Sequence, residues 1–592
     1  MENYNIQTVD KIHTKYVNFK KIASRRLYSY LELLYYFRPR YLMCFGYGIL
    51  GGLGMTPFNF IPFFIVSVFS IIRLCDFAKN AKESYFIGLW YFYGFSLIVF
   101  YWIPFSMLTD IKYYGLFPIV LLLMPFVYAI PHALMFMIYK EVSYYTNAIE
   151  RVMFFASVWC IFEYIRAFTF VAFPWGLTGY AMMFSSSIFQ FASVIGVYGF
   201  SVFLVFFASS VHLIFLNGDG YVYYGYLRYI FTFLIAMILM FVYGFFVLKF
   251  TKTQYQDNVM LRVVQAGIKQ TGDKTADERF DILNSHKTLT TSQSMDKITH
   301  IIWPESSVEF SIYQNEWVSH YLQQMLSPNQ ILIAGSMRIE ELSNSQNNNH
   351  IDNIKLYNTM SMLNGKGQQT YYDKHFLVPY GEFVPFRNVM PFLKSLTGDG
   401  IDYSAGKSVR VFKILNSPPF IPLICYESAF SGKLPVYTSF IKQDENGVNK
   451  VIKERAQWMI HITNDGWFGF TSGPFQHFQM SRARAIEYGM PVVRAANTGI
   501  TAIIDANGRV LQKIKLNKIG IINSPLPVAS KNETPFSIFG NLPALILVLL
   551  IFSFLFIHYA INKHYRKIIP LTTKVFDLLD KARGRQRDKR GD

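Results

Sequence analysis

The chain has 592 residues, of which 52% are hydrophobic and 16% charged, and its formal net charge is +18. This composition is too apolar for one soluble domain of this length and too charged for a membrane bundle alone, so it indicates both kinds of domain. Residues 1–40 carry eight Lys/Arg against three acids, and residues 561–592 carry ten against four. Because both clusters flank apolar segments, they favour anchoring at a membrane surface over a nucleic-acid partner.

A basic extension, residues 1–40, precedes a long apolar region, residues 41–255, which predicts a transmembrane domain of seven spans. No cleavable signal peptide is expected, because the first forty residues lack a short apolar core with a small-residue cleavage site. Most spans are long enough to cross about 30 Å of hydrocarbon. An eighth predicted span precedes the basic tail 561–592. The spans lie at about 41–55, 57–75, 86–105, 115–139, 151–170, 187–215, 228–250 and 541–560.

The basic residues of the loops predict the orientation of these spans. The loop around 171–186 has no Lys or Arg, whereas the loops on the same side as the N-terminus are basic. Since basic loops stay in the cytoplasm, both chain ends are expected there and residues 256–527 outside. The basic loop residues are Arg73, Lys79, Lys82, Lys140, Arg151 and Arg228.

Residues 256–527 predict a soluble domain of mixed α/β type. Short β-like runs alternate with helical segments such as 474–488, which stops at Gly489. The segment 500–514, with Asn507-Gly508 at its centre, predicts a hairpin. The β-like runs lie at 259–264, 298–303, 331–334, 409–412, 421–425 and 458–462.

Three residues of the soluble domain, Glu305, Lys374 and Cys425, each close or follow a strand-like stretch. Taken singly, they have common structural explanations as a helix cap, a surface lysine and a core cysteine. Together they are what acyl transfer at an amide-type site requires. The thiol is the nucleophile, the carboxylate takes its proton, and the ammonium stabilises the developing anion.

No metal or cofactor is expected. Cys425 is the only cysteine of the soluble domain, and the other three lie in apolar segments, where cysteine behaves as a small hydrophobe. No cysteine pair has metal or disulfide spacing. His375, His461 and His477 lack zinc-ligand spacing and are expected to be structural or surface groups.

Several motifs of the sequence match known families. The matching segments are Trp303–Glu305, Tyr357–Thr359, Lys374–Glu382 with Val384-Pro385, Ile424–Glu427, Asn464–Gly469, Arg482–Ala485, Pro491–Gly499, Glu163–Arg166 and Phe173–Gly176. On these segments, the soluble domain resembles the nitrilase, or carbon–nitrogen hydrolase, superfamily, and the chain over about residues 41–560 resembles the bacterial apolipoprotein N-acyltransferase family. One departure is Lys274, which stands where the family often has a tryptophan, so a stacking role there is not carried over.

The resemblance implies a four-layer αββα sandwich outside the cytoplasm on a membrane α-helical bundle of eight spans. It implies catalysis by Glu305 as general base, Lys374 as electrostatic stabiliser and Cys425 as nucleophile. It implies an enzyme of the bacterial inner membrane that acts as a monomer within the lipid bilayer. Supporting roles are implied for Asn358, Glu382, Tyr426 and Glu427, and substrate contacts for Trp467 and Phe468.

The reaction implied has two steps. Cys425 takes an acyl group from a membrane phospholipid as a thioester. The α-amine of the diacylglyceryl-modified N-terminal cysteine of an apolipoprotein then attacks that thioester.

Two alternatives stay open from the sequence. A membrane-tethered amidase of the nitrilase type would use water as acceptor, although a single anchor would suffice for it. A transporter with an accessory domain would need polar groups along a path through the spans, for which Glu163 and Arg166 are the main candidates.

Two loop segments, 386–404 and 466–475, combine large apolar side chains with glycines. We expect them to reach toward the bilayer and gate the access of acyl chains to Cys425. The alternative is that these side chains pack on the domain's own surface.

Overall fold

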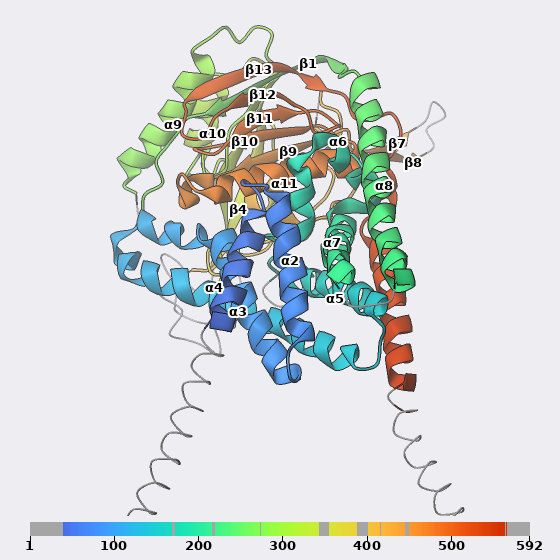
Figure 1. The fold of residues 1–592 in the computed structure, drawn as a ribbon. Coiled ribbons are helices and arrows are strands. Elements are labelled where there is room, and N and C mark those ends of the chain that lie inside the picture. The colour runs from blue at the N-terminus through green and yellow to red at the C-terminus, as the bar shows by residue number, and fades with distance from the viewer. Residues whose placement is uncertain are drawn as a thin grey trace, which may run out of the picture.

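The computed structural model consists of a helical part and a sheet domain stacked on it (Figure 1). Most of the predicted extensions 1–40 and 561–592, and most of the predicted gating segment 386–404, lie outside the described residues. Those described are 39–168, 172–215, 220–272, 274–341, 354–386, 401–414, 416–443, 449–562 and 564.

Within the described residues, the helical part contains eight long helices joined by short helical turns. The first is helix 39–53, and the last, Leu542–Asn562, follows the sheet domain. Between them lie α2 (Ile61–Asp76), α3 (Ala81–Phe100), α4 (Phe117–Ser143), α5 (Ala148–Phe168), α7 (Ala192–Ser210) and α8 (Gly220–Phe250). The short helices are η1 (Ile103–Thr109), η2 (Ile111–Leu116), η3 (Thr178–Phe184), α6 (Ser186–Phe189) and η4 (Val211–Phe215).

Four helices of the described chain are long and apolar enough to cross a membrane, and a fifth is added if the bent pair α3 and η1 is one span. Of the remaining helices, helix 39–53 and α2 have fewer than 18 residues, and α5 carries four charged residues. Helix α8 stands at the outer edge of the bundle (Figure 1) and exposes large apolar side chains along most of its length, as a lipid-facing helix does. Its most exposed apolar residues include Phe231, Ile235, Ile238, Leu239, Phe246 and Phe250.

The glycines of the first apolar segment have a packing role. A Cβ on Gly48 would lie 1.9 Å from the carbonyl oxygen of Tyr91, and one on Gly94 would lie 2.2 Å from that of Phe45. Helix 39–53 and α3 therefore touch backbone to backbone, which small residues permit between membrane helices.

The sheet domain contains two large sheets. The six-stranded sheet has the order β13-β1-β2-β3-β4-β5, and the five-stranded sheet the order β12-β11-β10-β9-β6. The first consists of β1 (Tyr255–Gln265), β2 (His300–Ile302), β3 (Ile331–Glu341), β4 (Ile354–Asn364), β5 (Gln369–Asp373) and β13 (Gly520–Pro527). The second consists of β6 (Phe420–Ile424), β9 (Trp458–Thr463), β10 (Val492–Ala496), β11 (Thr501–Ile504) and β12 (Val510–Ile514).

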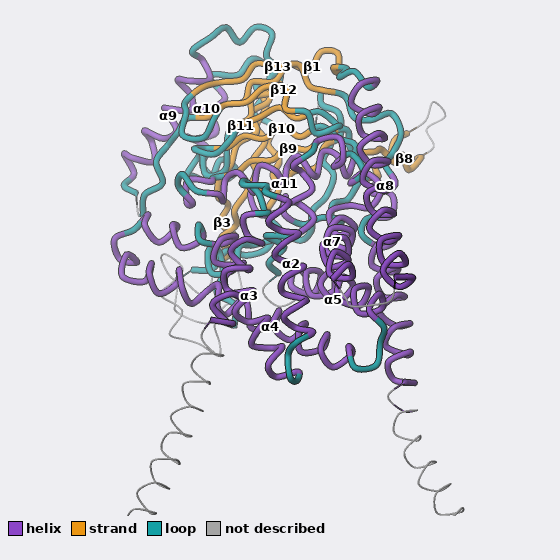
Figure 2. Tube along the Cα trace, in the orientation of Figure 1, coloured by secondary structure: helices purple, strands orange, loops and turns teal. Residues whose placement is uncertain are grey.

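These sheets pack face to face, with helices on their outer faces, as Figure 2 shows. One apolar cluster joins the inner faces of both sheets, a second packs α9 (Ala276–Thr291) and α10 (Glu316–Gln323) on the first sheet, and a third packs α11 (Ser472–Tyr488) on the second. The layers therefore follow the αββα order that the resemblance implies. Outside them lie the hairpin β7 (Tyr437–Gln443) and β8 (Asn449–Arg455), and the short helix α12 (Pro535–Phe539).

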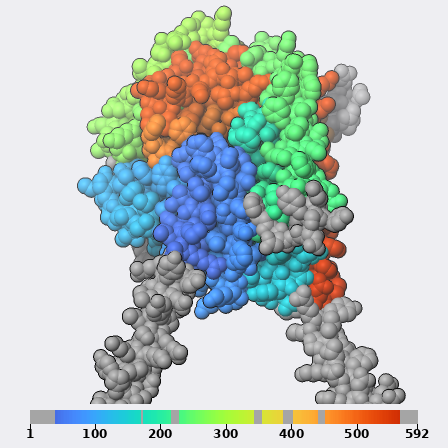
Figure 3. Space-filling view, viewed as in Figure 1, coloured from blue at the N-terminus to red at the C-terminus, as the bar shows by residue number. Residues whose placement is uncertain are grey.

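Helix α11 also joins the sheet domain to the helical part. Figure 3 shows orange residues of the sheet domain lying directly against the blue helices of the N-terminal part. The side-chain oxygen of Gln476 accepts hydrogen bonds from the indoles of Trp102 (3.2 Å) and Trp175 (2.7 Å). Glu487 accepts a hydrogen bond from the backbone N–H of Val197 (3.0 Å), where Gly196 interrupts the helical geometry of α7. Because these partners are buried, the two parts are held together by specific polar contacts as well as by apolar packing.

Candidate active site

Cys425 lies at the turn between strand β6 and the short helix η7 (Cys425–Ala429). Its φ is +51°, which is uncommon for a residue with a side chain, so the backbone of the turn is strained. Within residues 419–431, Cys425 is the only residue that is not fully buried. A partly exposed cysteine on a strained turn in an otherwise buried segment is typical of a nucleophile position.

Glu305 and Lys374 lie in one buried network with two further residues. The ammonium of Lys374 is 3.5 Å from Oε1 of Glu305 and 2.9 Å from Oε1 of Glu382. The amide of Asn358 donates to Glu305 (2.8 Å) and to Glu382 (2.9 Å), and the backbone N–H of Asn464 donates to Oε2 of Glu305 (2.8 Å). The carboxylate of Glu305 is thus oriented through both oxygens.

Each of these side chains is positioned by a strand of this sheet or by the loop that follows one. Glu305 follows β2, Asn358 is in β4, and Lys374 follows β5 directly. Glu382 is fixed because the backbone N–H of Val378 donates to its second oxygen (2.8 Å). Since β2 to β5 are neighbours in one sheet, they bring together residues that are far apart in the sequence.

Glu427 and Tyr426 hold the turn that carries the thiol. Glu427 accepts hydrogen bonds from the backbone N–H groups of Ile424 (2.8 Å) and His375 (2.7 Å) and from the hydroxyl of Tyr372 (2.6 Å). It therefore ties the Cys425 turn to the segment that follows Lys374. The hydroxyl of Tyr426 donates to the carbonyl of Ala172 (2.7 Å) in the helical part.

The pKa values of Lys374 and Cys425 are both raised, but for different reasons. Burial alone would lower the pKa of Lys374, but Glu382 and Glu305 outweigh it and hold that pKa above the usual lysine value. Burial raises the pKa of Cys425, the charge of Glu305 raises it further, and Lys374 opposes both. At neutral pH the site therefore holds an ammonium beside an un-ionised thiol, so the thiol needs a base before it can attack.

Trp467 and Phe468 lie in the short helix η8 (Asp465–Phe468), between β9 and α11. The ring of Phe468 packs edge-on against Trp102 of the helical part, with centroids 4.6 Å apart. Trp467 is 40% exposed and Phe470 is 77% exposed. In the segment 466–475, Phe468 thus packs on the helical part rather than on the sheet domain's own surface, whereas Trp467 and Phe470 are exposed.

Lys274 pairs with Glu309, its ammonium 2.7 Å from Oε1. A charged side chain paired in this way offers no aromatic face for stacking.

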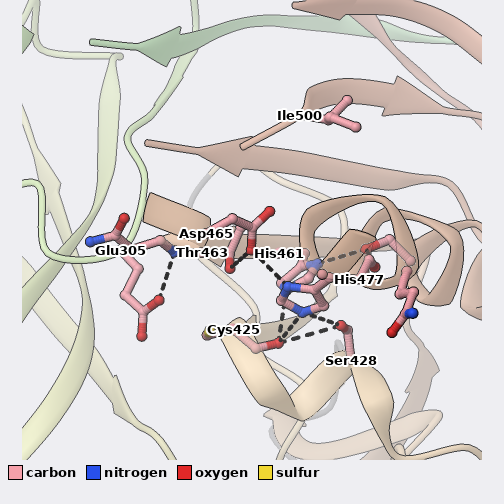
Figure 4. Close-up of polar contacts among 12 residues, drawn as sticks. Glu305, Cys425, Ser428, His461, Thr463, Asp465, His477 and Ile500 are labelled. Carbon is pink, nitrogen blue, oxygen red and sulfur yellow. Dashed lines mark hydrogen bonds and ion pairs between the residues drawn. The ribbon is translucent and has the colours of Figure 1, made fainter. Parts of the chain in front are cut away.

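The structure also brings four residues to the Cys425 turn whose role was not predicted: His461, Asp465, His477 and Arg494. All four are buried and linked by hydrogen bonds. Figure 4 shows His461, Asp465 and His477 beside Cys425. His461 and His477 are therefore not surface groups. The sequence offers one signal for them, a histidine inside the apolar strand Trp458–Thr463.

Comparisons with known proteins agree with this geometry. The family "Apolipoprotein N-acyltransferase N-terminal domain" matches residues 47–210, and the family "Carbon-nitrogen hydrolase" matches residues 261–535. The apolipoprotein N-acyltransferase of Rickettsia typhi is 31% identical over 534 residues, which cover 88% of this chain and 98% of that protein. The apolipoprotein N-acyltransferase of Rhodopseudomonas palustris is 31% identical over 520 residues, which cover 85% of this chain and 92% of that protein. This chain is a membrane protein that belongs to the apolipoprotein N-acyltransferase family.

Proposed function

We propose that this protein transfers a fatty acyl chain from a membrane phospholipid to the α-amine of the N-terminal diacylglyceryl-cysteine of apolipoproteins. The observation that carries the proposal is the position of the Cys425 turn. It is joined through Glu427 to the segment after Lys374 and through Tyr426 to the helical part, at Ala172. A nucleophile at the junction with membrane helices is placed to meet substrates that stay in the bilayer.

In the first half-reaction, Glu305 acts as general base and takes the proton of the Cys425 thiol. The sulfur attacks the ester carbonyl of the phospholipid, and Lys374 stabilises the negative charge that develops on the carbonyl oxygen. The ester C–O bond then breaks. Glu305 returns the proton to the leaving oxygen, so that a lysophospholipid departs and the acyl group remains as a thioester.

In the second half-reaction, the free α-amine of the apolipoprotein attacks the thioester carbonyl. Glu305 takes a proton from the amine, the C–S bond breaks, and the proton goes to the cysteine sulfur. The products are an N-acylated lipoprotein and the free thiol. Asn358 and Glu382 support both steps, because they orient Glu305 and Lys374.

The proposal includes a topology with eight spans and the sheet domain outside the cytoplasm, on the periplasmic side of an inner membrane. The eight long helices and the basic loop residues support it. A cysteine introduced at the exposed Lys366 should react with an impermeant maleimide in intact cells, and one at the exposed Lys79 should react only after lysis. Both variants carry Cys425→Ala, and the reverse pattern would refute the orientation.

The activity is tested by incubating the purified protein with phospholipid and a diacylated lipopeptide and weighing both protein and peptide. We expect an acyl adduct on the protein without peptide, and its transfer when peptide is added. Cys425→Ala should abolish both. An adduct that is lost equally fast with and without peptide would instead indicate a hydrolase that uses water. An adduct on the Cys425→Ala protein would remove Cys425 from the mechanism.

A further inference from the structure

The carbonyl oxygen of Cys425 lies against two buried imidazole rings (Figure 4). Nε2 of His461 and Nε2 of His477 are each 3.0 Å from this oxygen. His461 projects from β9, where it is opposite Leu423 of β6 and Arg494 of β10, and His477 projects from α11. Both side chains are fully buried. A buried backbone carbonyl needs a donor, so the proton positions on these rings decide which of them holds it.

The surroundings of His461 determine its tautomer. Its Nδ1 lies 2.9 Å from the hydroxyl of Ser481, which can donate or accept, and 2.9 Å from Nη1 of Arg494. Because a guanidinium can only donate, Nδ1 accepts. Burial and the charge of Arg494 lower the pKa of His461, which keeps the ring neutral. Its single proton is then on Nε2 and points at the carbonyl of Cys425.

Arg494 is itself held in place. It donates to Oδ2 of Asp465 (2.6 Å) and to the carbonyl of Ile500 (3.1 Å). Burial would raise the pKa of Asp465, but Arg494 and His477 outweigh this and lower it to about 2. Asp465 therefore stays ionised, and the guanidinium cannot turn away from His461 without leaving a buried carboxylate unpaired.

His477 has the opposite tautomer. Its Nδ1 lies 2.8 Å from Oδ1 of the ionised Asp465 and must donate to it. Burial and the charge of Arg494 lower the pKa of His477, which favours the neutral ring with its one proton on Nδ1. The hydroxyl of Ser428 lies 3.1 Å from Nε2 and donates to the Cys425 carbonyl at 3.3 Å. Of the two rings, His461 is the one that donates to Cys425.

This hydrogen bond matters because the Cys425 turn is strained. A positive φ at a residue with a side chain is energetically unfavourable and persists only where the surroundings impose it. The peptide group between Cys425 and Tyr426 is planar, so fixing its carbonyl also fixes the N–H of Tyr426. That N–H belongs to the first turn of η7, where backbone donors have no acceptor within the helix.

We propose that His461 is a positioning residue for acyl transfer: by holding the Cys425 carbonyl, it aims the thiol and the Tyr426 N–H at the acyl group of the substrate. The inference rests on the acyl transfer proposed above. It adds a residue that touches neither substrate nor thiol and acts through the backbone of the nucleophile.

The test compares two uncharged amides at the same position. In His461→Gln the side-chain amide can reach the place of Nε2 and donate to Cys425, while its oxygen can accept from Arg494. In His461→Asn the amide reaches only the place of Nδ1, so it can satisfy Arg494 but not the carbonyl. Both variants keep a polar group in the buried network and differ in the one hydrogen bond.

The readout is the single-turnover rate of acyl-enzyme formation at saturating phospholipid. We expect His461→Gln to stay within about fivefold of the parent and His461→Asn to lose about 30- to 100-fold, below the 10²–10³-fold typical of removing a direct donor. The KM for phospholipid and the rate of Cys425 alkylation by iodoacetamide should change less than threefold in both. Equal losses in the two variants, or a loss that follows a drop in melting temperature, would overturn the proposal.

A spectroscopic measurement on the parent protein covers the case in which His461→Asn does not fold. With ¹⁵N-labelled histidine, the signal that disappears in His461→Gln should show a neutral ring with its proton on Nε2. A proton on Nδ1, or a charged ring at pH 7, would overturn the proposal. If the parent protein forms no acyl-enzyme at all, the proposed function fails, which is distinct from the failure of this inference.

Discussion

Replacing Lys374 by methionine removes the cation of the active site and keeps much of its apolar bulk. The ammonium is 1% exposed and lies 3.5 Å from Glu305. At an effective dielectric constant of about 20, unit charges at that separation attract each other by about 5 kcal/mol. Glu305 and Glu382 both accept hydrogen bonds from the Asn358 amide, so without the cation the two carboxylates repel each other across it.

The same change removes the stabilisation of the carbonyl oxygen in the transition state. Loss of one preorganised donor of this kind typically costs about 10²–10³ in rate. We therefore expect Lys374→Met to slow acyl-enzyme formation by at least 100-fold. Lys374→Arg should remain at least tenfold impaired, because the planar guanidinium is larger than the buried space that an ammonium fills.

The assay follows the acyl adduct on the intact protein by mass spectrometry after mixing with phospholipid. Lys366→Met serves as the matched control, because Lys366 is an exposed lysine in the loop after β4. It should retain the parent rate. A rate for Lys374→Met within tenfold of the parent, with an unchanged melting temperature, would refute the electrostatic role of Lys374.

Three further predictions concern the thiol, the junction and the lipid face. Because burial raises the pKa of Cys425, its thiolate fraction at pH 7 is below that of a free cysteine. The rate of its alkylation by iodoacetamide should therefore be low at pH 7 and should still increase with pH above pH 9. A rate that reaches a plateau below pH 8 would contradict this. Glu487→Ala removes the carboxylate that lies 2.8 Å from the buried Arg484. This should lower the free energy of unfolding by about 3–5 kcal/mol, measured as a lower melting temperature in detergent. A melting temperature within 2 °C of the parent value would show that the pair is dispensable. Trp467→Ala should reduce acylation of the enzyme by full-length phospholipid more than acylation by a short-chain soluble ester. Trp317→Ala, at another exposed tryptophan, serves as the control. Equal loss with both substrates would indicate a packing role for Trp467.

The amino-acid sequence by itself determined the division into a membrane part and an α/β part, because apolar length and loop charge are local properties of the chain. It also supplied the chemical groups of the proposed active site, since a carboxylate, an ammonium and a thiol after strand-like runs are visible in one dimension. The sequence was less informative about the hydrogen-bond partners of charged residues within helices such as α5. There the carboxylate of Glu163 accepts from Trp159 and Thr178, and these partners allow a charged group inside an apolar bundle.

Only the tertiary structure decided how the groups of the site are held. The sharing of one Asn358 amide by Glu305 and Glu382 depends on neighbouring strands and a loop, and no spacing in the sequence implies it. The same is true of His461, which in the sequence is a lone histidine in an apolar strand. The register of three parallel strands, β6, β9 and β10, places Arg494 next to one nitrogen of its ring and the Cys425 carbonyl next to the other. These neighbours make His461 a donor to Cys425. Hydrogen-bond direction is a property of such three-dimensional neighbours, and so tautomer and backbone strain could not be read from the order of residues.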